Sequence, residues 1–319
     1  MKTEVSTDRN AAVELLRQGE VVALPTETVY GLAADALDPI AVAKIFEAKG
    51  RPRFDPLIVH LPGRDSLDKI ASLQKHDQQL IGTLAEKFWP GPFTIVLPKR
   101  GVIPEIVTAG LETVAVRISA HPVFAEIVRG FGKPLAAPSA NRFGRISPTT
   151  AKHVLDELGG LIPLIIDAGP TTHGIESTIV RVYDGKIDIL RRGPITPEQL
   201  SAFGKVEIAK PVGKVSSPGQ LASHYAPKTA LRLLDDVKSF ESRGQRCALL
   251  AWTPIKSDDR FVAIRNLSER QDLREAAANL FRYLRELDEL NVAFIVAERV
   301  PDHGLGAAIL DRLTRASQA

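Results

Sequence analysis

The stretch ALPTETVYGLAADALDPIAVAKIFEAKGRPRFDP, residues 23–56, combines a strand, a polar turn, a helix and a group of cations. An apolar run over residues 21–24 predicts a short strand. Pro25 ends that strand because proline cannot donate a hydrogen bond to a neighbouring strand. After the polar Thr-Glu-Thr, Gly31 is predicted to permit a backbone turn that other residues resist.

A helix is predicted to follow this turn. Asp38 suits the N-cap, and Pro39 suits the first helical position, where its missing N–H has no cost. Gly50 marks the end of the helix. The apolar stripe expected to face the core consists of Val42, Ile45 and Phe46.

Three cations surround the predicted end of this helix, namely Lys49, Arg51 and Arg53. A cation at a helix C-terminus offsets the helix dipole, which accounts for Lys49 on structural grounds alone. Arg51 and Arg53 lie beyond the helix, where the dipole explains less. Asp55-Pro56 then lead into the apolar residues 57–60, which predict a buried strand. Cations held between a helix end and a core strand favour the binding of a polyanion.

Composition sets limits on the class of protein. A length of 319 residues suggests about two domains, and 44% hydrophobic with 25% charged residues is typical of a globular protein. The net charge of +3 is too small for a general nucleic-acid binder, so any basic region must be local. One cysteine excludes a disulfide framework and a cysteine-based zinc site. The absence of an 18-residue apolar run and of a signal-peptide pattern predicts a cytoplasmic protein.

Helices and strands are predicted to alternate along the rest of the chain. Residues 203–228 lack regular patterning and read as a linker rich in Gly, Pro, Ser and Lys. The predicted helices cover residues 8–19, 66–88, 151–158, 273–290 and 307–315, and further strands cover 93–97, 114–118, 164–168, 174–180, 246–252 and 292–297, with one more ending near 190.

Polar residues at several predicted strand ends allow two interpretations. Arg117 either faces solvent from an alternating strand or is buried and paired, since arginine is rarely buried alone. The segment PLAAPSANRFGRISPT, residues 134–149, is either a turn followed by a helix cap or a set of donors for phosphate and ribose oxygens. Ser177 is not surrounded by the G-x-S-x-G pattern of a serine nucleophile.

These motifs together resemble the threonylcarbamoyl-AMP synthase family, the YrdC-type domain in its long, two-domain form. That family joins L-threonine, bicarbonate and ATP into threonylcarbamoyl-AMP for modification of tRNA. The segments that carry the resemblance are PTETVYGL (25–32), KGRP (49–52), PLIVH (56–60), VRIS (116–119), PSAN (138–141), GIEST (174–178), RRG (191–193) and SPGQLASHYAP (217–227). Two positions depart from the family pattern: Ser119 stands where proline is more usual, and Arg192 replaces a small residue or proline.

The resemblance implies an α/β protein with a catalytic domain over residues 1–202, built as an open twisted sheet with a basic concave site. Residues 203–228 would fold over the active site as a linker, and residues 229–319 would form a smaller, Rossmann-like domain. Strand-helix alternation in the C-terminal part favours the same architecture.

The resemblance also implies roles for individual residues. Catalysis is assigned to Lys49 and Arg51, which would neutralise phosphate charge without a covalent enzyme intermediate. Mg²⁺ bridging the phosphates is expected with ATP as substrate, although no all-protein metal site is visible. The alternative ATP-binding motif, a Walker loop, is absent from the sequence. The residues implied for ATP are Lys49, Arg51, Asp55, Thr113, Ser139, Asn141, Ser147, Arg191, His224 and Tyr225. Those implied for threonine are Thr28, His60, Arg117, Ala137 and Ser177.

The implied activity is that of an L-threonylcarbamoyladenylate synthase, a nucleotidyltransferase in the biosynthesis of threonylcarbamoyladenosine at position 37 of ANN-decoding tRNAs. Its product would pass to a tRNA threonylcarbamoyl-transferring complex, with tRNA contact left open. The alternative is a module that binds double-stranded RNA or tRNA without turnover. A carbamoyltransferase of the hydrogenase-maturation type is excluded, because such proteins need cysteine-rich zinc segments.

Overall fold

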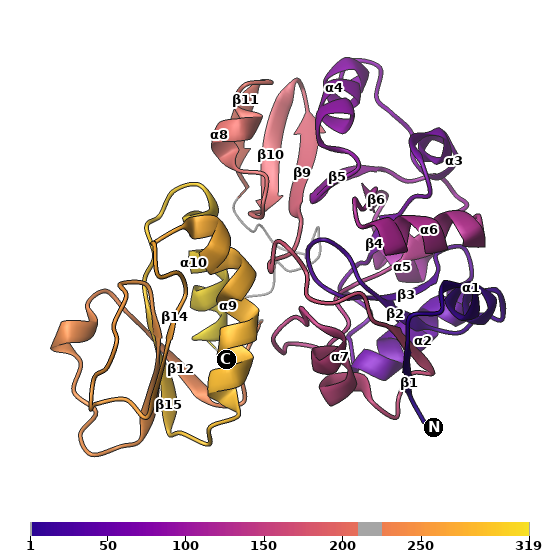
Figure 1. Cartoon of the computed structure of the whole chain (residues 1–319). Helices are drawn as coiled ribbons and strands as arrows, with labels where there is room; N and C mark the ends of the chain where they lie inside the picture. The colour runs from indigo at the N-terminus through magenta and orange to yellow at the C-terminus, as the bar shows by residue number, and fades with distance from the viewer. Residues whose placement is uncertain (1, 210–224, 319) are drawn as a thin grey trace. The chain divides into compact units, whose positions relative to one another are not determined.

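The computed structural model describes residues 2–209 and 225–318 (Figure 1). The described residues form two compact units. Unit 1 contains residues 2–143, 148–171 and 176–209, and unit 2 contains residues 144–147, 172–175 and 225–318. His224 and most of the predicted linker lie outside the described residues, so the prediction that the linker covers the active site stays a prediction.

Unit 1 has one sheet and helices on both of its faces (Figure 1). Its helices are α1 (Arg9–Arg17), α2 (Pro39–Lys49), α3 (Leu67–Ile70), α4 (Gln78–Phe88), α5 (Glu105–Thr108), α6 (Pro122–Phe131), α7 (Ala151–Leu158) and α8 (Pro197–Leu200), with a 3₁₀ turn η1 (Arg64–Ser66). Its strands are β1 (Glu4–Ser6), β2 (Val22–Leu24), β3 (Gly31–Asp35), β4 (Ile58–His60), β5 (Phe93–Pro98), β6 (Thr113–Arg117), β7 (Leu135–Ala136), β8 (Leu164–Ile166), β9 (Thr178–Tyr183), β10 (Lys186–Arg191) and β11 (Lys205–Ile208).

The sheet of unit 1 is open and mixes parallel and antiparallel pairs. Its strand order is β1-β8-β2-β3-β7-β4-β6-β5-β9-β10-β11. β4 and β6 run parallel, and β5 lies antiparallel to β6 and parallel to β9. Strands from four separate parts of the sequence therefore become neighbours in the centre of the sheet, which brings their ends together.

Side chains alternate between the two faces of this sheet. On one face, Val59 of β4 and Val116 of β6 belong to a large core covered by α2, α4 and α7. On the other face, α1 and α6 lie side by side and cover β2, β3 and β7 (Figure 1). Among the described residues, the same face over β4, β6, β5 and β9 carries a small apolar cluster, to which no helix contributes. His60 and Arg117 project on this less covered part, because they lie two residues after the cluster members Ile58 and Ala115.

Unit 2 has a four-stranded, all-parallel sheet with the order β12-β15-β13-β14. The strands are β12 (Ala230–Leu234), β13 (Cys247–Ala251), β14 (Ala263–Asn266) and β15 (Phe294–Glu298), accompanied by α9 (Leu273–Asp288), α10 (Leu305–Ala316) and the 3₁₀ turn η2 (Val237–Ser239). A large open sheet together with a second, parallel-sheet unit confirms the predicted fold class.

Three local predictions need correction. Gly31 does not form a positive-φ turn but begins β3, and its missing side chain lets the chain approach Ala137, whose Cβ would lie 3.3 Å from an added Cβ. The predicted helix over residues 66–88 is interrupted between α3 and α4. The segment read as irregular from residue 203 contains β11, which pairs with β10. Among the described helices, none combines the length and apolar character needed to cross a bilayer.

Candidate active site

The polar turn after β2 is shaped by its own threonine side chains. Thr26 Oγ1 accepts hydrogen bonds from the backbone N–H groups of Thr28 (3.1 Å) and Val29 (3.2 Å) and donates to the Val29 carbonyl (2.6 Å). Threonine hydroxyls favour such local turns because they satisfy backbone groups that no strand pairs. The turn fixes Thr28, whose Oγ1 lies 2.8 Å from that of Thr26.

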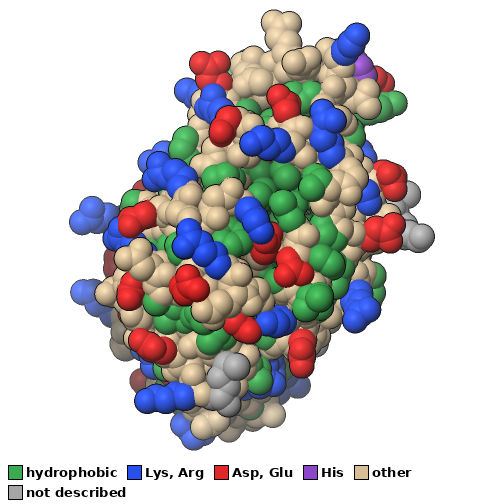
Figure 2. Space-filling model, turned by 90° about the vertical axis from the view of Figure 1, so that its right-hand side faces the viewer, with side chains coloured by type: hydrophobic (Ala, Val, Ile, Leu, Met, Phe, Trp, Pro, Cys, Tyr) green, Lys and Arg blue, Asp and Glu red, His purple; other side chains and the backbone are tan. Residues whose placement is uncertain are grey.

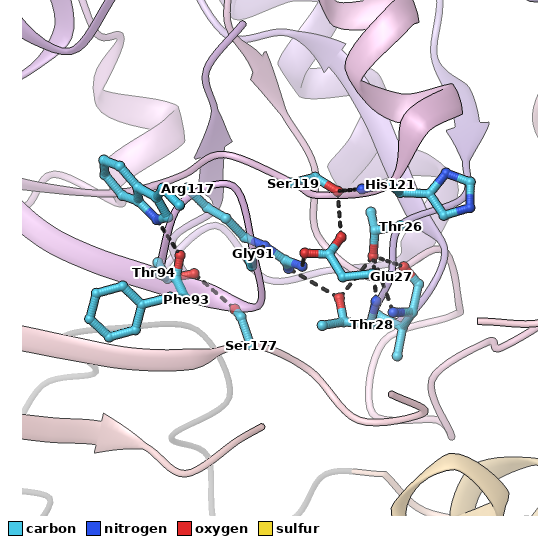
Figure 3. Close-up of polar contacts among 12 residues, drawn as sticks. Thr26, Glu27, Thr28, Gly91, Phe93, Thr94, Arg117, Ser119, His121 and Ser177 are labelled. Carbon is cyan, nitrogen blue, oxygen red and sulfur yellow. Dashed lines mark hydrogen bonds and ion pairs between the residues drawn. The ribbon is translucent and has the colours of Figure 1, made fainter. Parts of the chain in front are cut away.

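Arg117 ends β6 and is buried, with 3% of its surface exposed. Its guanidinium forms an ion pair with Glu27 (Nη2 to Oε1, 2.7 Å) and donates to Thr28 Oγ1 (3.1 Å) and to the Gly91 carbonyl (3.2 Å) (Figure 3). Of the two interpretations of Arg117, the buried and paired one is therefore confirmed. The three contacts come from two loops, before β3 and before β5, so they restrict the long side chain to one orientation.

The electrostatics around Arg117 favours an ionised Glu27 and a neutral His60. Burial opposes the charge on Glu27, but the Arg117 guanidinium and hydrogen bonds from Ser119 and Arg117 lower its pKa to about 2. Burial, reinforced by the nearby positive charge of Arg117, lowers the pKa of His60 to about 3. The His60 ring packs against Phe124 of α6 at 4.8 Å between centroids. A neutral imidazole can donate through one nitrogen and accept through the other.

Ser177 forms hydrogen bonds with residues of two strands, β5 and β10. Its hydroxyl lies 2.8 Å from Thr94 Oγ1 on β5 (Figure 3). Arg191, at the end of β10, donates to the Ser177 carbonyl through Nε (3.1 Å) and Nη2 (3.0 Å) and to its hydroxyl through Nη2 (3.1 Å). Thr94 is directly opposite Arg117 in the β5–β6 pair. A residue predicted to bind ATP, Arg191, thus contacts one predicted to bind threonine, Ser177.

Lys49 lies at the end of α2 and is 3% exposed. Its ammonium donates to the carbonyls of Ser139 (2.6 Å) and Asn141 (2.5 Å), so the loop after β7 folds around it. Burial, followed by repulsion from Arg51, holds the pKa of Lys49 well below its usual value. An incoming anion would favour the charged ammonium and relieve both effects.

Arg51 and Asp55 form a second buried pair close to Lys49. Arg51 Nη2 lies 2.9 Å from Asp55 Oδ2, and the guanidinium also donates to the carbonyls of Asp55 and Pro56. Burial raises the pKa of Asp55, while the positive charges of Arg51, Lys49 and Arg191 oppose that rise. All three cations are residues predicted to bind ATP, and all three act on the charge of this one carboxylate.

Several predicted residues have other positions. Thr113 begins β6, at the end opposite Arg117. Ala137, in contrast, lies beside His60, with which its backbone forms a hydrogen bond, and it donates its own N–H to the Ile58 carbonyl (2.9 Å). Ser147 and Tyr225 belong to unit 2, where Ser147 is fully buried. Tyr225 stacks on Phe281 of α9 at 5.5 Å between ring centroids.

Sequence reasoning missed Glu27, Thr94 and Ser119 as members of the site. Glu27 lay within the quoted Thr-Glu-Thr turn, and Thr94 is the polar residue in the otherwise apolar run 93–97. A polar residue inside a predicted core strand was the available signal. No group of three or more His, Cys, Asp or Glu residues suited to a metal ion occurs in the described ranges 2–209 and 225–318. The carboxylates of this site, Glu27 and Asp55, are both in ion pairs.

Two family models match the chain. One, named for Sua5, YciO and YrdC and described as "Telomere recombination", matches residues 14–193. The other, described as "Threonylcarbamoyl-AMP synthase, C-terminal domain", matches residues 195–318.

Individual proteins match over most of the chain. The threonylcarbamoyl-AMP synthases of Bacillus subtilis and Pyrococcus abyssi are 41% and 38% identical to it, over 96% of this chain in both cases and over 92% and 93% of the relatives. The crystal structure of Pyrococcus abyssi Sua5 complexed with L-threonine is similar with a TM-score of 0.87 at 35% identity, covering 100% of this chain and 98% of that one.

Proposed function

Because the chain belongs to the threonylcarbamoyl-AMP synthase family, we propose that its site joins L-threonine to bicarbonate and ATP, forming threonylcarbamoyl-AMP and pyrophosphate. The observation that carries the proposal is the contact of Ser177 with both Arg191 and Thr94, since Thr94 lies directly opposite Arg117 in the sheet. A site for two anionic reactants needs such continuity, since the reacting atoms must meet within about 3–3.5 Å.

The reaction proceeds in two steps. The amine of threonine adds to the carbon of bicarbonate, and loss of water leaves a carbamate. A carbamate oxygen then attacks the α-phosphorus of ATP, and the bond to the β-phosphate oxygen breaks to release pyrophosphate. Neither step requires a covalent bond to the enzyme, so the protein contributes positioning and charge stabilisation.

Threonine would bind around Arg117. A guanidinium has five N–H donors, and the contacts to Glu27, Thr28 and Gly91 leave donors for a substrate carboxylate. His60 is neutral near pH 7 and offers a donor or acceptor for the substrate hydroxyl. Thr28 and Ser177 would supply hydroxyl groups on either side.

The phosphates of ATP would bind at Lys49, Arg51 and Arg191. All three cations are buried, so their interaction with phosphate is screened less than at the surface. Mg²⁺ would enter with ATP and neutralise phosphate charge, because its preferred oxygen ligands in such sites include substrate phosphates. The chemistry classifies the enzyme as a nucleotidyltransferase. Its product would serve a cytoplasmic complex that transfers the threonylcarbamoyl group to tRNA.

The RNA-binding alternative is not favoured. On the face shown in Figure 2, Lys and Arg are interspersed with Asp and Glu and do not gather into one basic patch. A protein that tracks a phosphate backbone needs several exposed cations along its path. The cations of the candidate site are instead buried and paired.

The test is to incubate the protein with ATP, bicarbonate and single amino acids, and to follow pyrophosphate release and the mass of the adenylate. Release that depends on threonine, with the mass of threonylcarbamoyl-AMP, supports the proposal. Omission of bicarbonate is the control, and it should abolish the adenylate. Threonine-independent release, or a threonyl adenylate lacking the carbamoyl group, would overturn the assignment of substrates.

A further inference from the structure

Ser119 is buried and lies two residues after Arg117. Its hydroxyl donates to Glu27 Oε2 (2.5 Å) and accepts the backbone N–H of His121 (3.2 Å) (Figure 3). The hydroxyl therefore adds a contact to the group that surrounds Arg117.

The two oxygens of Glu27 have different partners. Oε1 faces Arg117 at 2.7 Å, and Oε2 accepts from Ser119. A carboxylate held at both oxygens does not rotate freely about its last torsion, which is otherwise broad. Charge-assisted hydrogen bonds are also shorter and stronger than neutral ones. The Ser119 hydroxyl thus keeps the other oxygen of Glu27 directed at the guanidinium.

We propose that Ser119 is a positioning residue for threonine: through Glu27, it fixes the Arg117 guanidinium in the orientation that binds the substrate carboxylate. The inference rests on the role proposed above for Arg117.

A purely structural role for Ser119 makes a different prediction. The hydroxyl accepts from His121, the N-cap residue of α6, and so contributes to the start of that helix. If that were its whole role, removal of the hydroxyl would lower stability and would not act on threonine in particular. The two roles are separated by comparing threonine and ATP kinetics and by asking whether the effect requires Glu27.

The experiment is a double-mutant cycle with Ser119→Ala, Glu27→Gln and the combined variant, following pyrophosphate release against threonine at saturating ATP and bicarbonate. We expect Ser119→Ala to raise the KM for threonine about threefold or more, as for one weakened charge-assisted contact, with kcat and the KM for ATP nearly unchanged. In the Glu27→Gln background the same substitution should have no further effect, because coupled residues are not additive. Ser119→Thr, which keeps the hydroxyl, should restore the KM.

Ser268 provides a matched control, since its hydroxyl donates to Glu275 Oε2 (2.6 Å) in unit 2. Ser268→Ala should leave the KM for threonine unchanged. An unchanged KM in Ser119→Ala, or an equal effect with and without Glu27, would overturn the inference while leaving the proposed function intact. Wild-type protein without threonine-dependent pyrophosphate release would refute the proposed function itself, and with it the inference.

Discussion

The burial of His60 predicts that unit 1 loses stability between pH 6.5 and 5. His60 is 2% exposed, and burial together with Arg117 lowers its pKa from 6.5 to about 3. As the pH falls below 6.5, the unfolded chain binds a proton and the folded one does not. The free energy of unfolding contributed by this group is therefore fully present above pH 6.5 and declines until the pH reaches about 3.

The size of this loss in stability follows from the lowered pKa of His60. Each pH unit below 6.5 costs about 1.4 kcal/mol, so lowering the pH to 5 should remove about 2 kcal/mol through His60 alone. Glu27 does not interfere in this range: its pKa is lowered from 4.5 to about 2, so its contribution is present above pH 4.5 and is lost only as the pH falls from there toward 2.

Urea unfolding at several pH values, followed by tryptophan fluorescence, measures the effect. Trp89 is buried in unit 1 and donates to the Phe93 carbonyl (2.6 Å), and a Trp252→Phe background removes the signal of unit 2. His60→Gln should reduce the decline between pH 6.5 and 5, and part of what remains comes from His121, whose pKa burial also lowers. His303→Gln, at an exposed position, is the control and should not. Equal slopes for wild type and His60→Gln would refute the lowered pKa.

Three further predictions concern the site. Lys49→Ala or Arg51→Ala should reduce adenylate formation at least tenfold with the fold retained, since charge-assisted contacts contribute about 1.5–3 kcal/mol each; near-normal rates in both variants would contradict the phosphate assignment. Adenylate yields at matched concentrations should rank threonine above serine and serine above valine, because a missing hydroxyl costs about 10⁴-fold and a missing methyl about 10–200-fold; valine above serine would mean that the pocket selects shape. Gly193→Ala should destabilise unit 1 by about 1–3 kcal/mol and lower activity, because the new Cβ would lie 2.5 Å from the Thr178 backbone nitrogen. Gly204→Ala is the control for thermal unfolding, because its new Cβ would have no atom closer than 3.5 Å. Equal melting temperatures for wild type and Gly193→Ala would show that the backbone near Gly193 shifts to accommodate the added methyl group.

The sequence alone was sufficient to predict the helices whose ends are set by neighbouring capping residues. α2 begins after Asp38, whose side chain accepts from the Ile40 N–H (2.8 Å), and it ends at Gly50 in the left-handed region, as predicted. α7 covers the predicted residues 151–158. Caps and turns depend on residues within a few positions, so their signals are complete in the sequence. The family motifs likewise indicated the activity before any contact was known.

Tertiary structure decided which side chains meet. Glu27 and Arg117 pair across 90 positions, and Ser177 meets Thr94 across 83. Both contacts depend on the order β3-β7-β4-β6-β5-β9 in the sheet. Helices α1, α2, α4 and α6 cover the two faces of this sheet, whereas periodicity along one strand carries no information about its neighbours. The same reason explains Gly31: the sequence showed a residue that tolerates unusual backbone angles, whereas the folded chain uses its small size against Ala137.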